Sequence, residues 1–167
     1  KIMGIKSKTK SRIYQEMKDA ELVLRFFALK DTFSNYSGGL KNILDNYLDK
    51  NQYLKEEKVN ELGKEFKDTL DIVQKVFGTE GAFRRWIPQR NKWKQQISAP
   101  IYDMQMFALY GKDKEQIIEN KEAILADFKK LFTQDTTFIE SIESSTATPA
   151  RFHYRINKLK EILNNYL

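Results

Sequence analysis

Cysteine is absent from this 167-residue sequence, and histidine occurs once, at His153. Without cysteine the chain can form neither a disulfide nor a thiolate metal site, which fits the reducing cytoplasm where we expect the protein to reside. A lone histidine excludes zinc sites built on two histidines, His-Asn-His nuclease centres and most histidine triads within this chain. These absences remove a large class of enzymes from consideration.

Long apolar runs are missing as well. The longest, from Leu22 to Leu29, is interrupted by Arg25, so no segment approaches the roughly 18 apolar residues that a membrane helix needs. No signal-peptide pattern is present and the chain begins with Lys1, so we expect a piece of a longer protein. The stretch "SGGLKN" lacks the spacing of a phosphate-binding loop, and no acid pair stands out as general acid and base. We find no complete active site.

The net charge of +6 is unevenly distributed. Residues 1–12 contain five basic residues and residues 84–94 contain five more, with no acid in either segment. The rest of the chain carries a small net negative charge. The basic character is therefore local, and these two segments are the ones to weigh as contacts for an acidic partner.

Apolar residues recur every three or four positions along most of the chain, which predicts helices and no strand. Gly78 is expected to end the helix that starts at Glu56, and a short helix at 81–86 followed by an irregular connection is expected next. Capping residues are Ser11, Ser98, Asp113 and Thr148, with a proline in the first turn after Ser98 and Thr148. The expected helices are 12–30, 40–48, 56–77, 81–86, 99–110, 114–132, a short one near 138–142, and 149–166.

This pattern predicts an all-α fold, an irregular multi-helix bundle of about seven to eight helices. Residues 12–167 are expected to form a single helical domain around one core. Residues 1–11 are interpreted as a basic linker remnant that follows another domain, with a recognition arm as the alternative.

Arg25 lies within the most apolar helix, four residues after Glu21. An acidic residue placed four positions before a basic one is the favourable order for an ion pair on a helix. If this helix is buried, an unpaired guanidinium would cost about 3 to 5 kcal/mol, so Arg25 needs partners. We interpret Glu21 and Arg25 as a structural ion pair, completed by a carboxylate or carbonyl from another segment. A direct ligand-binding role is the alternative.

The stretch "FRRWIPQRNKWK" alternates cations with indoles, a pattern typical of proteins that neutralise phosphates and stack bases of single-stranded nucleic acid. The candidate nucleic-acid-binding residues are Arg84, Arg85, Trp86, Arg90, Lys92, Trp93 and Lys94. The alternative is that the two tryptophans anchor the segment to the core while the cations face water. His153 has no neighbouring carboxylate or second ligand, so we assign it no catalytic or metal role.

The order of motifs resembles the helical carboxy-terminal half of proteins in the GmrSD-type restriction family, domain-of-unknown-function family 262. The similar segments are "KDAELVLRFFAL", "GGLKNILDNYLDKN", "FKDTLDIVQKVFGTEGAFRR" and "RINKLKEIL", which together run over nearly the whole chain. The most specific positions are Asp19, Glu21, Leu22, Leu24, Arg25, Phe26, Ala82, Phe83 and Arg84.

In that family the amino-terminal half is a ParB/sulfiredoxin-like domain with a D-G-Q-Q-R type motif tied to nucleotide binding or hydrolysis, and some members add a His-Asn-His nuclease domain. Members act in bacterial defence against phage DNA. This sequence contains neither part. The resemblance therefore implies an accessory helical region that scaffolds the amino-terminal domain and contacts DNA, holds no cofactor itself and is not catalytic. The alternative is a helical protein-protein interaction module without nucleic-acid binding.

Overall fold

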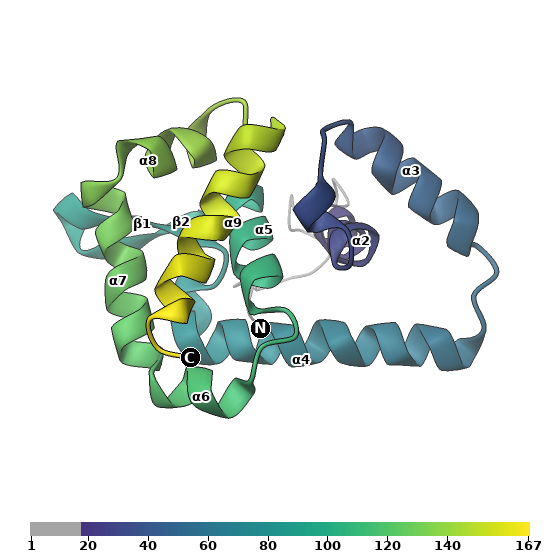
Figure 1. Cartoon of the computed structure of the whole chain (residues 1–167), viewed down its shortest axis with the longest axis horizontal. Coiled ribbons are helices and arrows are strands. Elements are labelled where there is room, and N and C mark those ends of the chain that lie inside the picture. The colour runs from purple at the N-terminus through teal and green to yellow at the C-terminus, as the bar shows by residue number, and fades with distance from the viewer. Residues whose placement is uncertain (1–17) are drawn as a thin grey trace.

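A computed structural model describes residues 18–167, whose backbone is mostly helical (Figure 1). The basic start at residues 1–12 and the cap expected at Ser11 lie outside the described residues. Residues 18–167 form eight helices, which confirms the predicted predominantly helical fold. These are α2 (Lys18–Leu29), α3 (Leu40–Asn51), α4 (Glu56–Gly81), α5 (Ala99–Leu109), α6 (Lys114–Glu119), α7 (Lys121–Gln134), α8 (Thr136–Glu143) and α9 (Pro149–Asn164).

Helix α5 forms the centre of the core, since every side chain from Ile101 to Leu109 is buried. It packs against α9, α4 and α2, and α9 crosses in front of it in Figure 1. A helix that is apolar all round is one that other elements surround. Two polar side chains, Asp103 and Gln105, are enclosed with it and must find partners inside the protein.

Helices α2, α3 and α4 are arranged more openly. Figure 1 shows α2 end-on between α3 and the first half of α4, which extends beyond the α5 and α9 body. Helix α3 packs against α2. Helix α2 is tied to α5, because the hydroxyl of Tyr102 donates a hydrogen bond to the Leu22 carbonyl oxygen at 2.6 Å. The position of α3 thus depends on that of α2.

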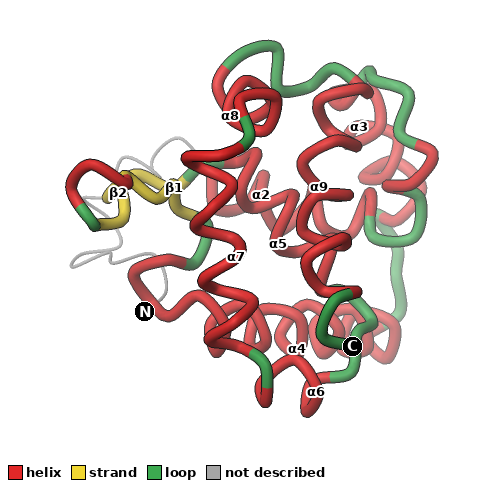
Figure 2. The backbone as a smooth tube through the Cα atoms, turned by 60° about the vertical axis from the view of Figure 1, so that its left-hand side comes forward, coloured by secondary structure: helices red, strands yellow, loops and turns green. Residues whose placement is uncertain are grey.

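The expectation of a short helix at 81–86 and of no strands is wrong. Strands β1 (Arg84–Ile87) and β2 (Lys92–Ile97) pair antiparallel, joined by a 3-10 turn (Pro88–Arg90). Trp86 lies opposite Trp93, and Asn91 takes the left-handed conformation that closes the turn (φ 47°). The hairpin projects beside α7 at the edge of the helical body (Figure 2). Its first strand is too short for alternation to stand out in the sequence.

Two helix boundaries differ from their predictions. The helix expected over 114–132 is broken at Asn120 (φ −103°, ψ 9°), which ends α6 and begins α7. Gly78 leaves the helical conformation (φ 68°, ψ 173°), as predicted, but helical turns resume as far as Gly81. Asp113 does cap α6, since its carboxylate accepts the Gln116 N–H at 2.9 Å.

Two glycines of α4 give opposite predictions for alanine substitution. At Gly81 an added Cβ would lie 2.8 Å from two carbons of the Trp93 indole, so Gly81→Ala should lower the free energy of unfolding by about 1 to 3 kcal/mol. At Gly63 nothing lies within 4 Å, so Gly63→Ala should raise it by about 0.5 to 1 kcal/mol. Urea denaturation measures both; a stable Gly81→Ala protein would contradict the hairpin packing.

Candidate functional site

Arg25 and Asp103 form a buried ion pair between α2 and α5. The Arg25 Nε and Nη2 atoms donate to the two Asp103 carboxylate oxygens at 3.1 and 2.9 Å. This two-point contact is the strongest geometry available to a guanidinium and a carboxylate. Burial alone would lower the pKa of Arg25, but Asp103 and then Glu21 raise it above its ordinary value. Arg25 therefore stays charged in the core.

Asp103 also binds a second arginine, at the Oδ2 atom that already accepts from Arg25 Nη2. Arg155, on α9, is 1% exposed and its Nη2 atom donates to Asp103 Oδ2 at 3.0 Å. Its Nη1 atom donates to the carbonyl oxygens of Ser141 and Thr146 at 3.3 and 2.7 Å. Burial lowers the pKa of Arg155, and Asp103 opposes that shift. One carboxylate thus joins α2, α5 and α9.

Glu21 supplies the third contact of Arg25, whose Nη1 atom donates to Glu21 Oε1 at 3.1 Å. The Glu21 side chain is half exposed, whereas Asp103 is fully enclosed. The sequence identified Glu21 but not Asp103, which lies 78 residues away along the chain. We define Arg25, Asp103 and Arg155 as the ionic cluster.

Arg84, which the sequence predicted to bind nucleic acid, is buried. Its guanidinium donates to the carbonyl oxygens of Thr79, Ala82 and Gln95 at 2.9 to 3.2 Å. Burial lowers its pKa, with Glu80 opposing the shift. These contacts hold the end of α4 against the hairpin, so Arg84 is occupied within the protein.

The two tryptophans face the helical body. Trp86 is 9% exposed, and its ring packs edge-to-face on Trp93 with centroids 5.0 Å apart. The Lys129 ammonium of α7 lies 4.0 Å from the centroid of the Trp86 ring, at cation–π distance. Trp93 also stacks against Phe128 at 6.3 Å. A base could stack on Trp86 only by displacing Lys129, so this arrangement favours anchoring over base stacking.

The remaining predicted cations differ in their surroundings. Arg85 forms an ion pair with Glu143 of α8. Arg90, Lys92 and Lys94 are exposed along the hairpin and make no ion pair within residues 18–167. We call these three residues the hairpin cations. Of the residues predicted to bind nucleic acid, these three are the ones that an anionic partner can reach.

His153 lies beside a backbone group, with Nε2 2.8 Å from the Tyr36 carbonyl oxygen. In the part of the chain that the structure describes, no cluster of histidine, aspartate and glutamate side chains is arranged to hold a metal ion. Within the same residues, no helix has both the length and the apolar character for a membrane crossing.

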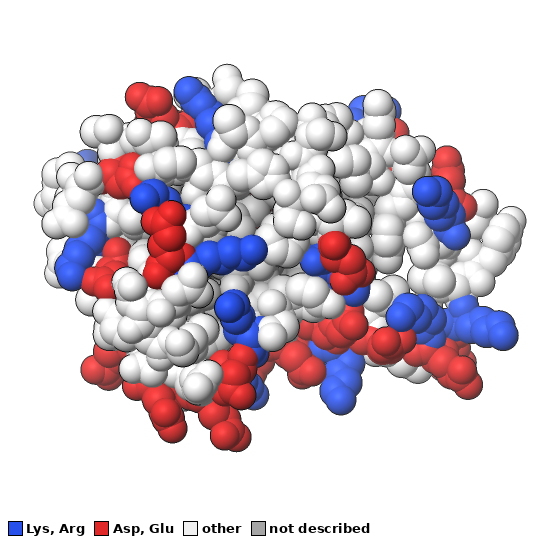
Figure 3. All heavy atoms as spheres, in the orientation of Figure 1, with Lys and Arg blue, Asp and Glu red and all other residues white. Residues whose placement is uncertain are grey.

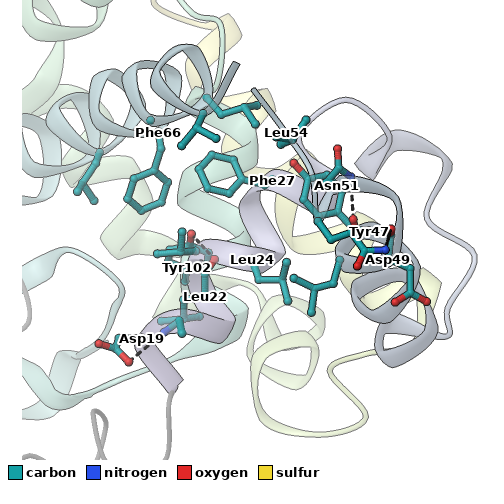
Figure 4. Close-up of a pocket in the computed structure, with 18 of the residues that line it drawn as sticks. Asp19, Leu22, Leu24, Phe27, Tyr47, Asp49, Asn51, Leu54, Phe66 and Tyr102 are labelled. Carbon is teal, nitrogen blue, oxygen red and sulfur yellow. Dashed lines mark hydrogen bonds between the residues drawn. The ribbon is translucent and has the colours of Figure 1, made fainter. Parts of the chain in front are cut away.

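A groove of about 1100 Å³ lies between α2, α3 and α4 (Figure 4). Most of its lining is apolar, including Leu24 and Phe27 of α2, Leu54, and Phe66 of α4. Two lining residues are large apolar side chains that are half exposed, Leu48 at 53% and Val59 at 51%. Tyr53, in the connection between α3 and α4, is 89% exposed. Exposed apolar surface that gathers around a concavity is typical of binding sites.

Sequence reasoning missed this groove. Leu48 and Val59 belong to the apolar stripes that identify α3 and α4, and such a stripe looks the same whether a neighbouring helix covers it or not.

Comparisons with family models, curated proteins and solved structures found no match to this chain. The features of the molecule that bear on function are the groove, the hairpin cations and the ionic cluster.

Arg25→Ala should lower the unfolding midpoint markedly, with a loss of about 3 to 5 kcal/mol, because Asp103 loses its two-point partner inside the core. Lys41→Ala is the control: it removes an exposed pair with Asp45 and should change stability by less than about 0.5 kcal/mol. Thermal unfolding measures both. Any DNA affinity per folded molecule should be unchanged by Arg25→Ala; unchanged stability with lost binding would contradict the structural role.

Proposed function

We propose that this chain is a helical docking region that supports a second domain. The groove between α2, α3 and α4 carries this proposal. The resemblance to GmrSD-type restriction proteins suggests the setting: a defence-type, nucleotide-dependent DNA restriction protein, in which a ParB/sulfiredoxin-like domain is the partner. In this proposal nucleotide chemistry belongs to that domain, and the helices described above position it.

The size and chemistry of the groove support docking of a protein segment. Its volume of about 1100 Å³ lies at the upper limit of the range, about 300 to 1000 Å³, that is common for small-ligand pockets. Its side chains are mostly apolar, and large apolar residues extend onto its rim. Covering Leu48 and Val59 with a partner removes apolar surface from water, which favours binding by roughly 25 cal/mol per Å² before the costs of association.

The open helical arrangement explains how the groove persists. Helix α2 is tied to the body by the ionic cluster and by Tyr102, while α3 and the first half of α4 lie on either side of it (Figure 1). Three helices present side chains towards one space, which is the arrangement that accepts a further helix through residues spaced at i, i+3, i+4 and i+7.

A neutral amphipathic peptide tests docking. The probe is a fluorescent helical peptide of about five turns with leucine at i, i+3, i+4 and i+7 and glutamine elsewhere. Leu48→Glu with Val59→Glu should weaken its binding about tenfold or more, because two charges would enter the apolar contact. Ala126→Glu with Ala150→Glu, at exposed positions of α7 and α9, is the charge-matched control and should leave anisotropy titrations unchanged. Equal binding by all three proteins would contradict docking in the groove.

The hairpin cations favour a second function, contact with nucleic-acid phosphates. Arg90, Lys92 and Lys94 are exposed and without acidic partners among the described residues. On the face shown in Figure 3, by contrast, acidic and basic side chains are interspersed along α4. Phosphate contact alone is independent of sequence, so this function is a supporting contact rather than recognition of a site.

Salt-dependent binding tests the hairpin cations. Three phosphate contacts predict a slope of about −2 to −3 for log affinity against log salt on DNA. The triple variant Arg90→Gln, Lys92→Gln, Lys94→Gln should flatten this slope, whereas Lys55→Gln, Lys64→Gln, Lys67→Gln, which removes the same charge from α4 and the residue before it, should not. Fluorescence anisotropy from low to moderate salt measures both. No binding by the unaltered protein at low salt would exclude DNA contact.

A further inference from the structure

Among residues 18–167, the charges that line the groove have one sign. Asp19 at the start of α2 and Asp49 near the end of α3 are the charged lining residues in this part of the chain, which contributes no lysine or arginine to the lining. They lie on opposite sides of the apolar row that contains Leu22 and Leu24 (Figure 4). An apolar occupant would therefore meet a carboxylate near each end.

Neither carboxylate has a cationic partner among residues 18–167. Asp19 accepts the Ala20 N–H at 2.9 Å in the first turn of α2. Asp49 makes no ion pair in the same part of the chain. This contrasts with the ionic cluster, where each residue forms an ion pair with another member of the cluster. Bringing a neutral or acidic segment against Asp19 and Asp49 would cost their hydration without compensation.

We infer that the groove receives an amphipathic helix whose apolar stripe is flanked by lysine or arginine near both ends. The inference rests on the proposed docking function and names the chemistry of its partner. The apolar stripe packs on Leu24, Phe27 and Phe66, and the flanking cations meet Asp19 and Asp49. The carboxylates thereby select the partner and fix the position of its helix along the groove.

A second copy of this chain fits the groove poorly. The large apolar side chains that are exposed in residues 18–167 are Leu48, Tyr53, Val59 and Leu167. Leu48 and Val59 line the groove itself, so the described residues of another copy offer no separate apolar helix to insert. Two grooves facing each other would also bring like charges together, which is unfavourable.

Two helical peptides that share the leucine stripe of the neutral probe test the charge preference. One carries lysine at both ends and the other glutamate. The lysine peptide should bind the unaltered protein about fivefold or more tightly than the glutamate peptide, in low salt. The protein's own net charge of +6 disfavours the lysine peptide at long range, so this preference would report the local carboxylates.

The double variant Asp19→Asn, Asp49→Asn should remove the preference while binding of the neutral peptide stays. Glu115→Gln with Glu119→Gln on α6 is the control and should keep it. Neutral-peptide binding with no charge preference in the unaltered protein would overturn this inference and leave docking standing. No peptide binding at all would overturn both. Sedimentation that shows a dimer abolished by Leu48→Glu would identify a second copy as the occupant and also overturn it.

Discussion

The Asp103 carboxylate determines how the helices are arranged. It lies on α5, which is buried all round, so its charge can be compensated only by groups that other elements bring into the core. Arg25 of α2 and Arg155 of α9 bind it from two directions. Helices α2 and α9 must therefore approach α5 at Arg25 and Arg155. These two contacts fix how the neighbouring side chains of the helices pack against α5. The arginine within the apolar α2 is explained by this requirement.

The groove follows from the same constraint. Because α2 is fixed to α5, the elements that continue from it, α3 and the start of α4, extend to one side of the body (Figure 1). They leave an apolar concavity that the chain's described residues do not fill, with Asp19 and Asp49 on opposite sides of Leu22 and Leu24 (Figure 4). The proposed function uses this concavity to hold a partner helix, while the hairpin, anchored through Trp86 and Trp93, presents cations elsewhere on the surface.

The helices could be predicted from the sequence because their stripes and caps are local features, as Asp113 and Gly78 show. The ion pair of Arg25 with Glu21 was accessible for the same reason, since the two residues lie one turn apart. Asp103 was not, because nothing local distinguishes a buried acid from the many exposed ones. The hairpin was missed because its strands are stabilised by Trp86, Trp93 and the distant α7, not by a long alternating pattern. The groove exists because no other described element covers these faces of α3 and α4. A local sequence pattern cannot indicate whether a helix face is covered.

Hydrogen exchange in an Arg25→Met variant tests most directly whether the ionic cluster fixes α2, and with it the groove. Methionine replaces the alkyl part of the arginine side chain with an unbranched apolar one and removes the charged hydrogen bonds to Asp103 and Glu21. The account predicts that amides of α2 and α3 lose protection selectively, while those of α5 and α9, which Arg155 and Asp103 still join, remain protected. Unchanged protection in α2, or an equal loss throughout the helices, would show that the cluster does not set the position of α2 and would contradict the account.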